Sequence, residues 1–311
     1  MQVLSHLRRV TDSPSFDIGS NVTKLQVFLF GALFGSILVM LLMELNYERI
    51  PISVKPAPEL SGPVNSSVKI FCWITTMPSN HGTKAIHIKA TWAPRCDRYL
   101  FMSSVDLPEL PAVAAVNREG RSYLWEKTAF ALNYVWTHFG EEFDFFYKAD
   151  DDTYALIDNL RLLLADYDPH TPVLIGQAHK SFLKQGYPSG GAGYVMSRAA
   201  LRLIVQGMKN TSMCYDQRFS LAEDLKLGAC AEELGIQLIH SVDENGHYHF
   251  YCYSPFERLK NHGLSAELTF DNHKEGTGCC ARNPVSFHYI KPEELYFLDY
   301  LLYTARSRGH S

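Results

Sequence analysis

The sequence has little net charge, and this sets one class of function aside. Its 311 residues carry a formal charge of −4, so there is no basic footprint of the kind that marks a nucleic-acid-binding surface. No internal repeat is visible either. The length fits one large catalytic domain, or two small ones, together with extra segments.

The sequence has no long hydrophobic run after residue 43. The one long run that it has ends at that residue. Residues 25–43, LQVFLFGALFGSILVMLLM, are 19 residues without a charge, close to the length that crosses the hydrocarbon core of a bilayer. The preceding segment has a slight excess of Lys and Arg, which favours a cytosolic tail. We therefore expect a cytoplasmic tail over 1–24 and an uncleaved, membrane-spanning signal-anchor over 25–43, with the rest outside the cytosol. A cleaved signal peptide is the alternative, although residues 44–48 make a poor cleavage site.

Cysteines are few, and their spacing is not that of zinc ligands. There are seven, of which Cys279 and Cys280 are adjacent. In an oxidising lumenal compartment the default expectation for them is disulfides. Seven is an odd number, so at least one thiol is left over or pairs with another chain. The same compartment would make the sequons at Asn65 and Asn210 usable for N-glycosylation.

The remaining chain divides into a stem and one folded domain. Residues 44–67 are rich in Pro and Ser without periodicity and predict a stem, so the lumenal domain would cover 68–311. Apolar runs predict strands within 68–76, 98–105, 143–149 and 172–177, and helical patterns lie between them at 81–96, 119–139 and 155–167, the last ending before Asp168-Pro169. This alternation predicts an α/β domain with a largely parallel sheet. In such a sheet, ligands bind outside the carboxyl ends of the strands.

Three consecutive aspartates, Asp150, Asp151 and Asp152, stand at such a strand end, before a helical pattern. One aspartate would suffice as a helix N-cap, and the other two would add only repulsion. A divalent cation resolves the repulsion, and carboxylate oxygens suit Mg²⁺ or Mn²⁺. In a membrane-anchored lumenal protein, Asp-x-Asp after a strand indicates a metal that holds a nucleotide-sugar diphosphate and acts as a Lewis acid on the leaving group.

Two other metal-binding families fit the aspartates less well. An EF-hand loop needs Gly at its sixth position and Glu at its twelfth, and neither is present. A haloacid-dehalogenase-type phosphatase would have Thr where Tyr154 stands.

Two further segments bear on the chemistry. Gly190, Gly191 and Gly193 precede a helical pattern, where they permit close backbone approach to a ligand or form a tight turn or bulge. Residues 221–236, LAEDLKLGACAEELGI, predict an amphipathic helix that begins with Glu223 and Asp224. These acids either complement the helix dipole or supply the base that takes a proton from an acceptor hydroxyl.

Several long motifs are now recognisable together. FYKADDDTYALIDNL, KQGYPSGGAGYVMSRAAL, AEDLKLGAC and GTGCCARNPVSFHYI occur in this order, and over 68–290 the chain resembles the core 1 β1,3-galactosyltransferase (T-synthase) family. The resemblance implies a Golgi type II membrane enzyme with a single GT-A-type (Rossmann-like) domain. Such enzymes transfer galactose from UDP-galactose to the 3-hydroxyl of GalNAc α-linked to Ser or Thr of glycoproteins, with inversion and using Mn²⁺.

The resemblance also implies roles for individual residues. Asp150 and Asp152 would bind the metal together with His288, which is otherwise a core histidine beside Phe287. Asp224 would be the catalytic base, and Glu223 would orient the acceptor. The donor and acceptor pocket would involve Asp151, Lys148, Tyr187, Gly190, Gly191 and Gly193. The implied disulfide candidates are Cys72 with Cys96, Cys214 with Cys230, and the adjacent Cys279 and Cys280, with Cys252 as the odd thiol.

One segment departs from the family pattern. The family has a Trp- and Tyr-rich run before its GCC motif. In residues 264–280 of this chain, Phe270 is the only Phe, Tyr or Trp. An aromatic platform is therefore lost, or moved to HYHFYCY at 247–253. Two alternatives to the enzyme stay open: a chaperone-like, non-catalytic relative, which would lack the Asp-x-Asp motif that this chain retains, and a β1,3-transferase with a diverged acceptor. A homodimer and a dedicated folding chaperone are the further partners that the family suggests.

Overall fold

The computed structural model describes residues 67–180, 182–210, 214, 222–260 and 276–305. Within these ranges no helix is long and apolar enough to cross a membrane. The predicted tail and anchor, the stem up to residue 66, Asn65 and Phe270 all lie outside the described residues.

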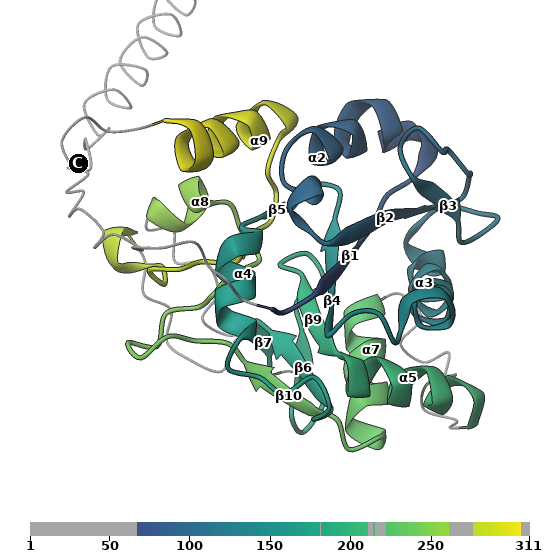
Figure 1. Cartoon of the computed structure of the whole chain (residues 1–311). Coiled ribbons are helices and arrows are strands. Elements are labelled where there is room, and N and C mark those ends of the chain that lie inside the picture. The colour runs from purple at the N-terminus through teal and green to yellow at the C-terminus, as the bar shows by residue number, and fades with distance from the viewer. Residues whose placement is uncertain (1–66, 181, 211–213, 215–221, 261–275, 306–311) are drawn as a thin grey trace, which may run out of the picture. The chain divides into compact units, whose positions relative to one another are not determined.

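A seven-stranded sheet with the order β10-β6-β9-β4-β1-β2-β3 forms the centre of the domain (Figure 1). Its strands are β1 (Ile70–Thr75), β2 (Arg98–Ser103), β3 (Ala112–Ala114), β4 (Phe145–Asp150), β6 (Val173–Gly176), β9 (Tyr194–Ser197) and β10 (Gln237–His240). β9 runs antiparallel to β4 and β6, and the other neighbours are parallel. The prediction of an α/β domain with a largely parallel sheet is confirmed.

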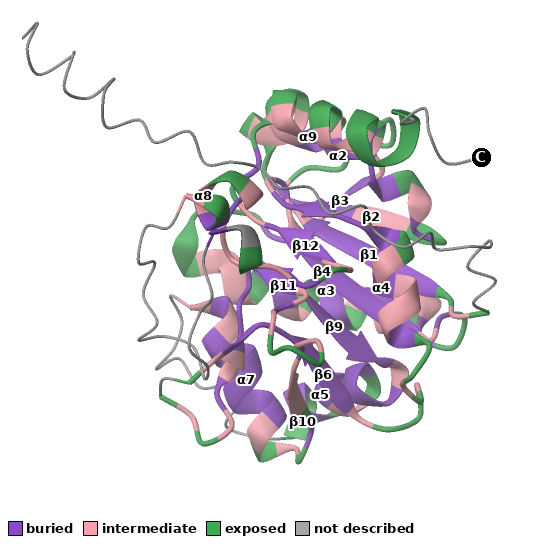
Figure 2. Cartoon of the chain, turned by 90° about the vertical axis from the view of Figure 1, so that its left-hand side faces the viewer, coloured by how far each residue is buried: buried purple, intermediate pink, exposed green. Residues whose placement is uncertain are grey.

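Helices cover both faces of this sheet. Alternate residues of a strand point to opposite faces, so Ile70 and Cys72 pack in one core and Phe71 and Trp73 in the other. The first core includes residues of α2 (Ile86–Ala90), α4 (Ile157–Leu164) and α9 (Pro292–Asp299), and the second includes residues of α3 (Leu124–Phe139), α5 (Arg198–Asn210) and α7 (Glu223–Glu233). The central strands β1, β4, β6 and β9 are almost fully buried between them (Figure 2). The strand β10 at one edge is partly exposed.

A small second sheet joins distant parts of the chain. It has the order β11-β12-β5, formed by Phe250–Tyr251, Ser286–Phe287 and Tyr154–Ala155. β12 pairs antiparallel with β5, with Phe287 opposite Tyr154. Because β5 begins two residues after Asp152, this pairing brings His288 beside the aspartates. The remaining elements are the β7–β8 hairpin (Ala178–His179 with Tyr187–Pro188) and α8 (Pro255–Leu259).

Three predicted helices differ in the structure. The pattern over 81–96 forms a single turn at His81–Ala85, the short α2 and a 3₁₀ turn at Ala93–Arg95, because Thr91 leaves the helical conformation and Pro94 lacks a backbone donor. α4 ends at Leu164, short of the predicted Tyr167, whose N–H closes a turn onto the Leu164 carbonyl.

The third difference concerns α7, which is not amphipathic. The residues it buries include Glu223, Lys226 and Cys230 as well as its apolar side chains. It packs against α3, α5, β8 and β10, so little of its circumference faces solvent. A helix enclosed in this way has no need of a polar face.

Three disulfides are present among the described residues. Cys72 pairs with Cys96 and Cys214 with Cys230, as the family resemblance implies, and Cys279 pairs with its neighbour Cys280. Cys252 is left as a thiol. Asn210 is exposed at the end of α5, while the two residues that complete its sequon lie outside the described residues.

Candidate active site

The register of β1 and β4 positions the three aspartates. Thr75 is the partner of Asp150 in this parallel pair, so both strands end at the same edge of the sheet. The Thr75 hydroxyl donates a hydrogen bond to the Asp150 carboxylate. Asp151, one residue on, accepts hydrogen bonds from Thr76 Oγ1 at 2.7 Å and from Asn80 Nδ2 at 2.9 Å. The chain after β1 is therefore tied to the aspartate turn.

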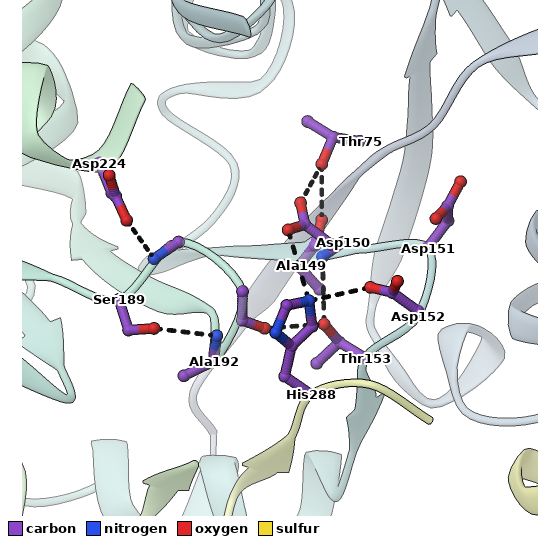
Figure 3. A network of polar contacts seen from close by, with 12 residues as sticks. Thr75, Ala149, Asp150, Asp151, Asp152, Thr153, Ser189, Ala192, Asp224 and His288 are labelled. Atoms are coloured by element: carbon purple, nitrogen blue, oxygen red, sulfur yellow. Dashed lines mark hydrogen bonds and ion pairs between the residues drawn. The ribbon is translucent and has the colours of Figure 1, made fainter. Parts of the chain in front are cut away.

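Asp150, Asp152 and His288 converge on one point (Figure 3). His288 Nε2 lies 3.0 Å from Asp152 Oδ1 and 3.9 Å from Asp150 Oδ2. Asp151 points away from His288 in the same view. Burial by itself would raise the pKa of Asp152, but its hydrogen bonds and electrostatic interactions with His288 and Lys84 hold this pKa well below its usual range. Asp152 is thus kept as a carboxylate.

The three side chains fit a hard divalent cation. One ligand atom from each lies within 4.8 Å of the others. Octahedral coordination at bond lengths near 2.1 Å places adjacent ligand atoms about 3 Å apart, so only small movements are needed. Two carboxylates and one imidazole suit Mn²⁺. Asp151 has a different role, because its hydrogen bonds fix the segment after β1.

Lys148 is a buried cation at the centre of the site. Its side chain is 3% exposed, and its Nζ lies 2.6 Å from Asp150 Oδ1. The same Nζ donates to the Gly190 carbonyl at 3.0 Å. The N–H of Gly190 donates in turn to Asp224 Oδ2 at 3.0 Å. One glycine residue therefore connects the metal-ligand side of the site to Asp224, through its carbonyl and its N–H.

The glycines of the loop at 190–193, which precedes β9, have separate functions. A Cβ on Gly191 would lie 2.2 Å from the His288 ring, so only glycine permits the ring at this position. Gly193 has φ +82° and turns the chain into β9, where a Cβ would meet the Lys148 carbonyl. A strand, and not a helix, follows the loop directly. Gly193 does not border the cavity described below, contrary to the expectation for it.

Glu223 and Asp224 begin α7 on the far side of this loop. Glu223 is 7% exposed, and its Oε1 accepts hydrogen bonds from Tyr194 Oη at 2.5 Å and Thr128 Oγ1 at 3.1 Å. Burial raises the pKa of Glu223, and Lys148 opposes this shift. Asp224 is half-buried and accepts from its neighbour Leu225 N–H at 2.9 Å as well as from Gly190. Their assignment to acceptor orientation and to proton abstraction remains a prediction.

A cavity of 660 Å³ opens over these groups, within the range of sites for small-molecule ligands and cofactors. It collects six carboxylates, together with Lys148, Gly190, Gly191 and His288; the six are Glu119, Asp150, Asp151, Asp152, Glu223 and Asp224. Tyr187, expected to line it, instead packs against Gly228 of α7 and the His179 ring. It does not reach the cavity because α7 lies close against β8.

The segment at 247–253 is not an aromatic platform. Tyr248, Phe250 and Tyr251 are buried in the first core, where Phe250 and Tyr251 form β11 of the small sheet. Tyr253 alone of this segment's aromatic residues borders the cavity, beside Tyr289 at a ring-centroid distance of 6.3 Å.

The sequence did not indicate four polar residues at the end of β1 and in the segment after it: Thr75, Thr76, Asn80 and Lys84. Each contacts an aspartate of the cluster, and Lys84 Nζ lies 2.9 Å from Asp152 Oδ2. The sequence predicted a largely parallel sheet, whose strands have their carboxyl ends at one edge. Which strand lies beside the aspartates, and so which polar residues reach them, is known only from the pairing of β1 with β4.

The chain is similar to a family model and to several known proteins. The model of the Fringe-like family matches residues 65–291. Glycoprotein-N-acetylgalactosamine 3-beta-galactosyltransferase 1 of Xenopus laevis is 37% identical over 264 residues, which cover 81% of this chain and 71% of that protein. Beta-1,3-glucosyltransferase of Mus musculus is 29% identical over 56% of this chain and 35% of its own length. Among solved structures, a galactosyltransferase in complex with donor and acceptor sugar analogues aligns at a TM-score of 0.42 and 11% identity, over 76% of this chain and 98% of that chain.

Proposed function

The chain belongs to the Fringe-like family, and on that premise we propose that it is an inverting glycosyltransferase of the GT-A type. It transfers galactose from UDP-galactose to the 3-hydroxyl of GalNAc α-linked to Ser or Thr of glycoproteins. The observation that carries this proposal is the kinship with the Xenopus laevis galactosyltransferase over four fifths of the chain. The geometry of the site supports it at each step.

The metal end of the cavity would hold the donor diphosphate. Asp150, Asp152 and His288 are the residues that would bind Mn²⁺, which supplies Lewis-acid stabilisation of the departing nucleoside diphosphate. Lys148 forms a buried ion pair with Asp150, and the lowered pKa of Asp152 keeps its carboxylate charged. The ligand set is therefore arranged before any donor arrives.

The acceptor end would centre on Asp224. An inverting single displacement needs one carboxylate to take the proton of the attacking hydroxyl on the side away from the leaving group. Asp224 borders the cavity and is fixed by the Gly190 N–H. Glu223, next to it, is buried with Tyr194 and Thr128 and would orient the acceptor through the oxygen that those residues leave unbonded.

The location of the enzyme is also proposed. Residues 25–43 would anchor it in the Golgi membrane as a single-pass type II protein, with the catalytic domain in the lumen. The three disulfides of the described domain suit such an oxidising compartment.

The direct test uses the purified full-length chain in detergent with UDP-galactose, Mn²⁺ and an α-GalNAc glycopeptide. Galactose transfer is scored by mass spectrometry beside an Asp152→Ala control. Transfer that requires the metal and disappears in the control is the expected result.

Two other outcomes would replace the proposal. Mn²⁺-dependent binding of UDP without transfer would indicate a β1,3-transferase with another acceptor, which the loss of the aromatic run before Cys279 favours. A folded protein that neither binds UDP nor transfers galactose would be a non-catalytic relative.

A further inference from the structure

Lys84 already neutralises the aspartate cluster in the structure. It stands on the single turn His81–Ala85, an element separate from the strand that carries the aspartates. Its Nζ lies 2.9 Å from Asp152 Oδ2 and 3.5 Å from Asp151 Oδ1. Asp152 thus presents Oδ1 to His288 and Oδ2 to Lys84.

Lys84 differs from the other lysine of the site in its freedom to move. Lys148 is enclosed, with 3% of its side chain exposed, and is fixed by the Gly190 carbonyl. The Lys84 side chain is 34% exposed. Within the described ranges, its ion pairs go only to Asp151 and Asp152. A long, flexible ammonium of this kind can exchange one anion for another without disturbing the core.

The charge of the site changes when its ligands bind. A dication on Asp150, Asp152 and His288 cancels most of the attraction that Asp152 has for Lys84. A nucleoside diphosphate on that dication then brings new negative charge beside it. Phosphate oxygens form strong charge-assisted hydrogen bonds with lysine.

From this geometry we propose that Lys84 is a donor-binding residue that changes partners. It pairs with Asp152 in the structure, and with a metal and a nucleoside diphosphate bound it would turn to a phosphate oxygen. The inference rests on the proposed function in so far as the ligand is a nucleotide-sugar diphosphate. It predicts that Lys84 weakens metal binding and strengthens donor binding, two effects that a merely structural lysine would not combine.

The test compares the full-length chain with Lys84→Met, Lys84→Arg and the matched control Lys89→Met. Lys89 lies five residues further along the same segment and contacts the Glu109 carbonyl instead of the aspartates. Calorimetry measures Mn²⁺ binding without nucleotide, and UDP binding at saturating Mn²⁺. Lys84→Met should bind Mn²⁺ about 2- to 5-fold more tightly, because a half-exposed competing ion pair is gone. It should bind UDP about 10-fold or more weakly, because a charged hydrogen bond is lost.

The control variants sharpen the result. Lys84→Arg should keep UDP affinity near that of the wild type, and Lys89→Met should change neither affinity. Unchanged UDP affinity in Lys84→Met overturns the proposal, as does weaker Mn²⁺ binding in that variant, which would make Lys84 a structural support of the site. An equal loss of UDP affinity in Lys84→Arg overturns it as well, because the positive charge would then not be what the donor needs.

The same data separate this inference from the proposed function. A wild-type chain that shows these differences in binding but transfers no galactose to an α-GalNAc glycopeptide supports Lys84 as a donor ligand and overturns the proposed acceptor. A wild-type chain that binds no UDP at all overturns both.

Discussion

Replacing Gly191 by alanine should displace a metal ligand while leaving the fold in place. The added Cβ would lie 2.2 Å from His288 Cε1 and 2.3 Å from Nδ1, whereas ordinary contact begins at 3.4 Å. The backbone of Gly191 does not have the positive φ of Gly193, so alanine is compatible with it. The ring is the far end of a side chain and can swing away. His288 Nε2 would then leave Asp152, from which it is now 3.0 Å distant.

The size of the effect follows from this displacement. The ring must retreat by roughly 1 Å, a misplacement that is large for a functional group. Disturbing the orientation of a metal ligand typically costs about 10- to 100-fold in metal affinity, equivalent to about 1.4–2.7 kcal/mol. The cost to folding should be smaller, about 1 kcal/mol, because one methyl group is added beside a movable ring.

The assay is a Mn²⁺ titration of galactose transfer, checked by calorimetric Mn²⁺ binding and by thermal unfolding. Gly190→Ala is the matched comparison, since its Cβ would approach Glu223 and Asp224 at 3.2–3.4 Å instead of His288. It should lower turnover without raising the Mn²⁺ requirement. Gly82→Ala is the inert control, because nothing lies within 4 Å of its Cβ. A Gly191→Ala enzyme with the wild-type Mn²⁺ requirement would refute the assignment of His288 as a ligand.

Three further predictions concern the base, the buried cation and pH. Asp224→Asn should lower kcat by about 10²- to 10⁴-fold while calorimetric UDP binding with Mn²⁺ stays unchanged; retained turnover would exclude Asp224 as the base. Lys148→Met leaves Asp150 and the Gly190 carbonyl without their buried partner and should lower the free energy of unfolding in urea by about 1–3 kcal/mol, so a loss below a few tenths would contradict the structural role given to it. Burial lowers the pKa of His249 below its ordinary value of 6.5, against the opposing charge of Asp243. As pH falls below about 6.5, His249 binds a proton in the unfolded chain but not in the folded one, so the free energy of unfolding decreases on acidification. The free energy of unfolding of His249→Gln should therefore depend less on pH in this range. A variant with the wild-type pH dependence would contradict this explanation.

Much of the site could be predicted because its parts are local in sequence. The aspartate triplet was recognised because three adjacent carboxylates after an apolar run would repel one another. The apolar run predicted the strand before the triplet, and helical periodicity predicted α3. Acids at the start of a helix are common, so the pattern left Glu223 and Asp224 open between complementing the helix dipole and supplying a base. Only the family resemblance assigned them separate roles. His288 depended on the same resemblance, because its place beside Asp152 is set by the long-range pairing of β12 with β5.

Other residues could not be placed without the structure. Tyr187 was expected in the sugar pocket, but the close approach of α7 at Gly228 directs it elsewhere. An apolar and aromatic sequence such as 247–253 is compatible with lining a cavity and with filling a core. The burial of Tyr248, Phe250 and Tyr251 in the structure shows that it fills a core. The contacts of Lys84 depend on where a short, irregular turn sits against another strand, and no periodic pattern encodes this.

The pairing of β12 with β5 also determines at what point of synthesis the proposed metal site can be completed, because β12 lies late in the chain. A chain emerging from the ribosome up to residue 240 already contains every strand of the central sheet and all of the carboxylates around the cavity. His288 emerges only about fifty residues later, and domains are built from the N-terminus onward. A chain of that length still lacks His288, the third residue that would hold the metal, so the complete ligand set would exist only when the domain is nearly finished.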